Sequence, residues 1–165
     1  MSSAPGDRSA RPDVRLTPVR GADRPWLVAM GLDPELIGRQ YHWAETPLQL
    51  LIAPLRAALG PHVAACTVWV DGRRAGYIGR SPLSGNYEDV LRPWARGGGV
   101  GRRMIADFLA HHRSGDQGRA FFVSAHNPRS LRALLASLGD LGWREPDDYE
   151  VVAVRFGTEV RVRQG

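Results

Sequence analysis

The sequence predicts a single α+β domain in which strands and helices mix along the chain, and three observations support this. Its 165 residues are the size of one ordinary domain with one sizeable core. Its composition, 43% hydrophobic and 24% charged, is that of a folding chain. A predicted hairpin in the first half is followed in the second half by strands that alternate with helices.

The domain is predicted to span residues 14–165, after a disordered tail of residues 1–13. The tail consists mainly of Ser, Ala, Pro, Gly and Arg and offers almost no side chain to bury. Residues 14–19 alternate apolar and polar side chains, which predicts a short first strand. Helical patches are predicted at residues 25–30 and 47–59.

The strongest signal in the first half is a hairpin. The dipeptide Asp71-Gly72 suits a two-residue turn in which both residues take positive φ. The strands on either side are predicted at residues 63–70 and 74–81. A further strand is predicted at residues 86–91, because a proline two residues later stops it.

The second half shows a regular alternation of elements. Apolar residues at helical spacing predict a helix of about thirteen residues that begins at Val100. Residues 120–125 form a short apolar run that is typical of a buried strand. The pair Asn127-Pro128 then favours a new helix, since Asn is a preferred N-cap and Pro a preferred first helical residue. β-Branched residues predict a closing strand at residues 149–156.

Composition excludes several classes of function. No run of about eighteen apolar residues exists and the amino terminus lacks the apolar core of a signal peptide, so we expect a cytoplasmic protein with no membrane partner. The one cysteine, Cys66, allows no internal disulfide and no Cys-rich zinc site, and we expect no metal. All 22 basic residues are arginine, which excludes a P-loop and lysine Schiff-base chemistry.

The segment that carries chemistry is glycine-rich and runs from a strand end into a helix start. Four glycines within residues 97–101 let the backbone approach a ligand closely, and the first amides of a helix have no carbonyl partner within it. Together with the helix dipole, these amides predict a cradle for a diphosphate. The net charge of +5 also favours an anionic ligand. Four arginines lie between residues 90 and 106 with no acidic residue among them: Arg92, Arg96, Arg102 and Arg103.

The spacing of this segment indicates a family resemblance. A dinucleotide fingerprint is excluded, because the residue three after Gly99 is Arg102 and not glycine. The segment resembles instead the GNAT acyl-CoA-dependent N-acyltransferases, whose motif reads R/Q-x-x-G-x-G/A just after a strand that ends in V-x-P. The resemblance covers residues 63–156 and includes Asn127 at the start of the next helix. The matching residues are Arg96-Gly97-Gly98-Gly99-Val100-Gly101 after Leu91-Arg92-Pro93.

The resemblance implies a mixed, mostly antiparallel central sheet with helices on both faces and a splayed strand pair that holds CoA. It implies an N-acetyltransferase that moves an acetyl group from acetyl-CoA, or an acyl group from another acyl-CoA, to a primary amine. We interpret the acceptor as a small molecule whose amine attacks directly in a ternary complex. The resemblance leaves open whether the protein forms a homodimer. The residues that it implies in CoA binding are Leu91, Arg96, Gly97, Gly98, Gly99, Val100, Gly101, Arg102 and Asn127.

Two carboxylates are candidates for the base that takes the proton of the amine. Glu88 and Asp89 lie on the strand that leads into the loop and point to opposite faces, so at most one of them faces the acceptor. We prefer Asp89, although a solvated strand carboxylate explains either residue equally well. His126 is an alternative base, or a histidine with a structural role only.

One position departs from the family pattern. Many members carry a tyrosine seven residues after the asparagine, where its hydroxyl can protonate the leaving thiolate, and Leu134 takes that place here. The candidate substitutes are Ser137, Tyr87 and Tyr149. The remaining alternative is that the thiolate leaves unassisted.

Two other classes of function stay open. A module that binds acyl-CoA without catalysis would release no thiol with any amine. A nucleic-acid module, or a transferase that acts on an RNA-linked amine, would need a basic stripe interleaved with exposed aromatic residues. An amine on a protein stays open as an alternative acceptor of the N-acyltransferase. We do not expect nucleic acid, because the basic residues concentrate at the glycine-rich segment. Four aromatic residues are interpreted as core in preference to an acceptor pocket: Trp26, Tyr41, Trp43 and Trp69.

Overall fold

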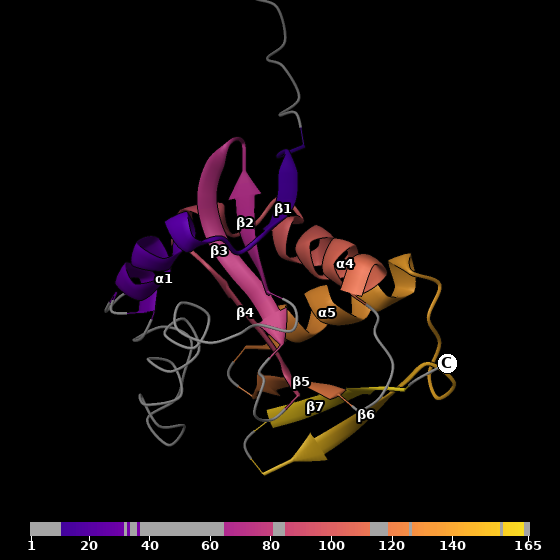
Figure 1. The fold of residues 1–165 in the computed structure, drawn as a ribbon. Helices are drawn as coiled ribbons and strands as arrows, with labels where there is room; N and C mark the ends of the chain where they lie inside the picture. The colour runs from indigo at the N-terminus through magenta and orange to yellow at the C-terminus, as the bar shows by residue number, and fades with distance from the viewer. Residues whose placement is uncertain are drawn as a thin grey trace, which may run out of the picture.

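One seven-stranded sheet organises the part of the chain that the computed structural model describes (Figure 1). That part comprises residues 11–31, 33, 36, 65–80, 85–112, 119–125, 127–155 and 157–163. The strands are β1 (Val14–Pro18), β2 (Ala65–Val70), β3 (Arg73–Arg80), β4 (Tyr87–Leu91), β5 (Arg119–Ser124), β6 (Tyr149–Val154) and β7 (Gly157–Val162). The helices are α1 (Arg24–Gly31), α4 (Val100–His112) and α5 (Pro128–Asp140), with the 3₁₀ turns η1 (Gly21–Asp23) and η2 (Pro93–Ala95).

The sheet is mixed and mostly antiparallel. Its strand order is β1-β2-β3-β4-β5-β7-β6, and only the neighbours β4 and β5 are parallel. Helices α4 and α5 lie together on one side and α1 on the other (Figure 1). Phe108 of α4 and Leu138 of α5 belong to the larger core cluster, whereas Leu27 of α1 packs with Tyr77 and Val90 in a smaller one. The predicted sheet with helices on both faces is confirmed.

Local signals in the sequence predicted several elements correctly. Asp71 and Gly72 turn the β2–β3 hairpin with φ angles of +50° and +73°. Helix α4 begins at Val100 and has 13 residues. Asn127 caps α5, because its side-chain oxygen accepts a hydrogen bond from the Ser130 amide at 3.2 Å. The helical patch predicted at residues 47–59 lies outside the described residues.

The closing strand predicted at residues 149–156 is instead the first half of a hairpin. Strand β6 ends at Val154, and β7 returns along it and along β5. Gly157 makes the close approach to β5 feasible, since a Cβ at this position would lie 2.2 Å from the carbonyl oxygen of Val123. The sequence analysis did not predict β7 as a second strand, because no recognisable turn dipeptide separates it from β6.

Strands β4 and β5 meet at a single point and then part. Tyr87 and Phe121 are their one registered pair, whereas β3 and β4 are paired over five positions and β5 and β7 over six. The rings of Tyr87 and Phe121 stack with centroids 4.5 Å apart, and Phe108 packs edge-on against Tyr87 at 6.0 Å. This aromatic cluster fixes the branch point of the predicted splayed pair.

The backbone of β3 also needs a glycine where it meets the end of β4. A Cβ on Gly76 would lie 2.0 Å from the carbonyl oxygen of Val90, a clash with backbone that no rotamer relieves. We expect Gly76→Ala to lower the free energy of unfolding by about 3 kcal/mol or more, at the upper end of overpacking costs. Chemical denaturation measures this change. Gly21→Ala, whose Cβ meets no atom within 4 Å, is the control, and equal midpoints for the two variants would contradict the prediction.

Candidate active site

A loop of consecutive glycines joins η2 to α4. Gly97, Gly98 and Gly99 have φ angles of +100°, +55° and +78°, which glycine adopts without the penalty that a Cβ brings. Helix α4 begins immediately afterwards. We call residues 96–101 the glycine loop. The loop therefore lies at the positive end of the α4 dipole.

Five amides of the glycine loop and of the residue that follows it lack partners. Within the described part of the chain, five successive or near-successive N–H groups donate to no acceptor, whereas the Val100 amide donates to the Gly97 carbonyl at 3.0 Å and the Arg103 amide to the Gly99 carbonyl at 3.0 Å. Such a set of amides at a helix N-terminus binds anions. The five amides belong to Gly97, Gly98, Gly99, Gly101 and Arg102.

The outer side of the glycine loop is open. A Cβ built on Gly97 or Gly99 would meet no atom within 4 Å. Only at Gly98 does another segment approach, since Pro12 lies 3.0 Å from the Cβ position. The residues present therefore leave room for a diphosphate against the amides, and Pro12 lies beside that space.

The arginines near the glycine loop are less available than the sequence predicted. Arg102 forms a bidentate ion pair with Asp140 of α5, with Nε 2.5 Å from a carboxylate oxygen, and the hydrogen bond lowers the pKa of Asp140. Arg103 donates to the carbonyl of Pro12, and Arg96 donates through Nε to the carbonyl of Leu91 at 3.0 Å. The sequence predicted a positive charge here with no acidic residue among the arginines. This charge is partly neutralised, because the fold brings the carboxylate of Asp140 to Arg102, 38 residues away in the sequence.

Leu91 and Asn127 flank the gap between β4 and β5. Leu91 is buried at the end of β4, and its carbonyl accepts the hydrogen bond from Arg96. Asn127 follows β5 through a turn in which its amide donates to the carbonyl of Ser124 at 2.9 Å. Because β4 and β5 are parallel, the two residues lie at the same end of the two strands, with the glycine loop continuing from Leu91.

The two candidate carboxylates point to opposite faces of β4. Asp89 shares the face of Tyr87 and Leu91, which belong to the core under α4 and α5. Glu88 shares the opposite face with Val90, on the side of α1, and its carboxylate accepts a hydrogen bond from the Tyr77 hydroxyl at 3.2 Å. Tyr77 was missed by the sequence reasoning, because only the register of β3 against β4 brings it near Glu88.

Burial of Asp89 makes stability depend on pH. Desolvation raises the pKa of this carboxyl from 3.8 to about 6, so between these values the folded chain holds a proton that the unfolded chain has released. Stability therefore falls as pH rises from about 4 through 6, by on the order of 2–3 kcal/mol. We expect Asp89→Asn to unfold at higher denaturant concentration than the parent at pH 7.5 but not at pH 4. An equal difference at both pH values would contradict this.

The candidate general acids are engaged in packing. Ser137 is fully buried between α4 and α5, with its hydroxyl 2.7 Å from the Ala133 carbonyl and 2.8 Å from the Arg102 carbonyl. Tyr87 forms the aromatic branch point, and Tyr149 lies in β6. The alternative base His126 lies outside the described residues, as do Tyr41 and Trp43. Leu134 is a core residue.

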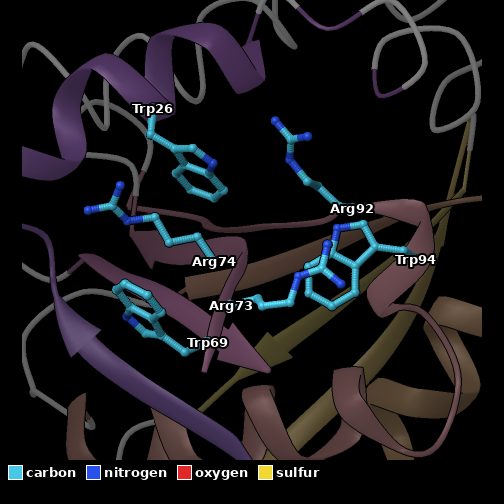
Figure 2. Close-up of a pocket in the computed structure, with 6 residues that line it drawn as sticks. All are labelled: Trp26, Trp69, Arg73, Arg74, Arg92 and Trp94. Carbon is cyan, nitrogen blue, oxygen red and sulfur yellow. The ribbon is translucent and has the colours of Figure 1, made fainter. Parts of the chain in front are cut away.

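A pocket of about 440 Å³ lies on the α1 side of the sheet, next to the end of β4 (Figure 2). Tryptophan and arginine side chains from α1, the β2–β3 hairpin and η2 line it. Trp26 and Trp69, interpreted from the sequence as core residues, are both among them. We call it the Trp–Arg pocket. Its lining residues are Trp26, Trp69, Arg73, Arg74, Arg92 and Trp94.

Three further observations limit the chemistry of the described residues. No helix among them is long and apolar enough to cross a membrane. The described residues contain no group of three or more His, Cys, Asp or Glu side chains that could hold a metal ion. Cys66 is buried in β2, where desolvation raises the pKa of its thiol to about 11, so it packs as a small apolar residue.

Comparison with known proteins identifies the fold. No protein-family model and no curated protein sequence matches the chain. The solved structure of AAC(6')-Ib with ribostamycin and coenzyme A matches with a TM-score of 0.57 at 14% identity, over 92% of this chain and 93% of that chain. A chimera of the spermidine N-acetyltransferase SpeG from Vibrio cholerae and hSSAT matches with a TM-score of 0.54 at 11% identity, over 90% and 92%. The chain has the GNAT fold.

RimL, a ribosomal L7/L12 alpha-N-protein acetyltransferase solved with coenzyme A, shares this GNAT fold with a TM-score of 0.57 at 10% identity, over 90% of this chain and 92% of that chain. In the GNAT fold of this chain, the parting of β4 from β5 and the glycine loop adjoin each other, as the sequence resemblance implied. At identities of 10–14%, these likenesses show the fold and not the roles of individual side chains.

Proposed function

We propose that the chain is an acyl-CoA-dependent N-acyltransferase that transfers an acetyl group to a primary amine on a small molecule. The observation that carries the proposal is the set of unpartnered amides at residues 97–99, 101 and 102, which follows the point where β4 parts from β5. Structures with the same fold are acetyltransferases, and those of AAC(6')-Ib and RimL hold coenzyme A. SpeG and AAC(6')-Ib are named for amine-bearing acceptors, spermidine and aminoglycosides.

The chain's own groups fit a diphosphate with an extended arm. Amides of the glycine loop would hold the diphosphate, and the open side at Gly97 and Gly99 admits it. The arm would enter between β4 and β5, with backbone groups of Leu91 on one side and Asn127 on the other. Arg96 and Arg102 would contribute charge, although Arg102 is already paired with Asp140.

When bound, acetyl-CoA supplies a thioester whose carbonyl carbon bonds to the amine nitrogen as the C–S bond breaks. The chain's main contribution is to hold the two reactants together, which is worth about 7–11 kcal/mol in favourable cases. Backbone N–H groups along the open edge of β4 can stabilise the oxygen on which negative charge develops. No side-chain acid is assigned, since the hydroxyl of Ser137 and the ring of Tyr87 are both committed to the core.

We place the base at Glu88, although the sequence favoured Asp89. Glu88 points to the same side of the sheet as α1 and the Trp–Arg pocket, and the Tyr77 hydroxyl fixes one of its oxygens. Asp89 points toward α4 and α5. An amine that approaches from the α1 side would therefore meet Glu88 first and release its proton to that carboxylate.

Ligand-dependent unfolding and thiol release test the proposal together. Acetyl-CoA at about one hundred times its Kd should stabilise the fold by about 2.7 kcal/mol, which a thermal shift detects. Incubation with acetyl-CoA and a panel of primary amines should then release free CoA thiol. Stabilisation without thiol release for any amine would identify a binding module, and no stabilisation by CoA would refute the assignment of the glycine loop.

A further inference from the structure

The Trp–Arg pocket lies on the same side of the sheet as Glu88. Glu88, Val90 and Arg92 alternate along the same strand direction, and the ladder continues to Arg92, whose amide donates to the Ala75 carbonyl at 2.8 Å. Their side chains therefore face the same side of the sheet. The Cα atoms of Glu88 and Arg92 are separated by about 13 Å, four residues of extended chain. One small molecule can span this interval.

Indole rings hold the arginines of the pocket in place. Each of the three guanidinium groups lies over one indole ring. Such a cation–π contact stabilises the cation by about 0.5–2 kcal/mol and does not require a neighbouring carboxylate. Figure 2 shows the Arg92 side chain extended toward the space beside Trp26, and Arg73 against Trp94. The guanidinium carbons of Arg73, Arg74 and Arg92 lie 4.4, 5.3 and 5.7 Å from the ring centroids of Trp94, Trp69 and Trp26, respectively.

The positive charge of the pocket is only partly balanced. Asp23 pairs with Arg74 at 3.0 Å, but Arg73 and Arg92 form no ion pair within the described part of the chain. The Nε atoms of Arg74 and Arg92 are buried and donate to no acceptor. Burying a donor without an acceptor costs about 1–3 kcal/mol of folding free energy, so native folds contain few such donors and each one calls for an explanation.

We propose that the Trp–Arg pocket binds an oxyanion of the acceptor, a carboxylate or a phosphate, next to a flat apolar part of the same molecule. Arg92 and Arg73 bind the oxyanion, and the indole faces contact the flat part. This inference rests on the proposed function and narrows it, because the acceptor becomes an amine that also carries a negative charge. A polycationic amine is disfavoured, since it would meet uncompensated arginines.

Matched acceptor pairs test the inference. Thiol release is measured with aromatic amino acids and with their carboxamides, and with phosphoethanolamine and ethanolamine; spermidine represents polycationic amines. We expect kcat/KM at least tenfold higher for an anionic member than for its neutral partner, and no turnover of spermidine. The two pairs separate carboxylate from phosphate as the preferred oxyanion. A preference for the neutral members or for spermidine would overturn the inference.

Two variants locate the effect in the pocket. Arg92→Gln should raise KM for the anionic acceptor by 10- to 100-fold, leave KM for its neutral partner unchanged and leave the Kd of CoA unchanged. Arg73→Gln, at an exposed position, should act in the same direction and serves if Arg92→Gln does not fold. Arg144→Gln, an exposed arginine after α5, is the matched control. Equal losses for both acceptors, or a weaker affinity for CoA, would overturn the inference, the latter by assigning the pocket to a phosphate of CoA.

Failure of this inference and failure of the proposed function give different results. Binding of the acceptor pairs is measured by calorimetry in the presence of CoA, which requires no turnover. Tighter binding of the anionic member, lost in Arg92→Gln, supports the pocket even where no thiol is released. Thiol release that does not depend on acceptor charge supports the acyltransferase and overturns the pocket.

Discussion

Gly101→Leu is expected to weaken CoA binding by more than a hundredfold while leaving the fold intact. Gly101 lies in the first turn of α4, and a Cβ there would make only an ordinary contact, 3.9 Å from Cδ1 of Leu91. The larger side chain would extend beside the unpartnered amides of Gly101 and Arg102, against which the diphosphate is proposed to lie. Leucine also favours a helix more than glycine does, so the free energy of unfolding should not fall.

Isothermal titration calorimetry with CoA measures the effect of Gly101→Leu, and chemical denaturation verifies the fold. Gly139→Leu in α5 is the matched control, because it places the same side chain on a helix where a Cβ meets no atom within 4 Å. An unchanged Kd for Gly101→Leu would remove the glycine loop from the binding site. A substitution at Gly99 would be a poorer test, since its φ of +78° strains any residue with a side chain.

Glu88→Gln is expected to lower kcat by about 10²–10⁴-fold at neutral pH and to leave the Kd of CoA unchanged. The amide retains an oxygen that can accept the hydrogen bond from Tyr77, but it cannot take a proton from the attacking amine. In the parent protein kcat/KM should rise with pH as the attacking amine loses its proton. The measurement is a pH–rate profile of thiol release for the parent and the variant.

Asp89→Asn is the matched comparison for Glu88→Gln, because it neutralises the neighbouring carboxyl on the other face of β4. We expect turnover close to that of the parent, together with the change in stability above pH 6 described for this variant. A slow Asp89→Asn beside a fast Glu88→Gln would return the role of base to Asp89, which the sequence favoured. Parent-like rates for both variants across the pH range would exclude β4 as the source of the base.

Sequence reasoning succeeded where a few neighbouring residues determine a structure. Asp71-Gly72 specifies its turn through backbone preferences alone, and Asn127-Pro128 specifies the start of α5 through one side-chain hydrogen bond and one fixed φ. The succession of glycines before Val100 has the same local character. Such signals need no knowledge of the rest of the fold.

The features that the sequence did not reveal depend on distant segments. Asp140 neutralises Arg102 across 38 residues, and the hydrogen bond from Tyr77 to Glu88 requires the β3–β4 register. The Trp–Arg pocket combines residues of four separate elements or loops, with Trp26 and Arg92 contributed by different halves of the domain. The sequence analysis weighed core packing of Trp26 and Trp69 against a role in an acceptor pocket, and the pairing of these tryptophans with arginines became visible only in three dimensions.

The lone registered pair of Tyr87 and Phe121 divides the sheet into two parts, β1 to β4 and β5 to β7, and neighbouring strands within each part share five or six registered pairs. Within either part, a displacement of one strand relative to its neighbour breaks several ladder hydrogen bonds at once. Between β4 and β5 it disturbs one registered pair and one ring stack. The boundary between β4 and β5 is therefore where the sheet opens locally at the lowest cost in free energy. The arm of CoA is proposed to enter at this boundary. A small rotation of β5–β7 relative to β1–β4 would widen the sheet there without unpairing any strand within either part.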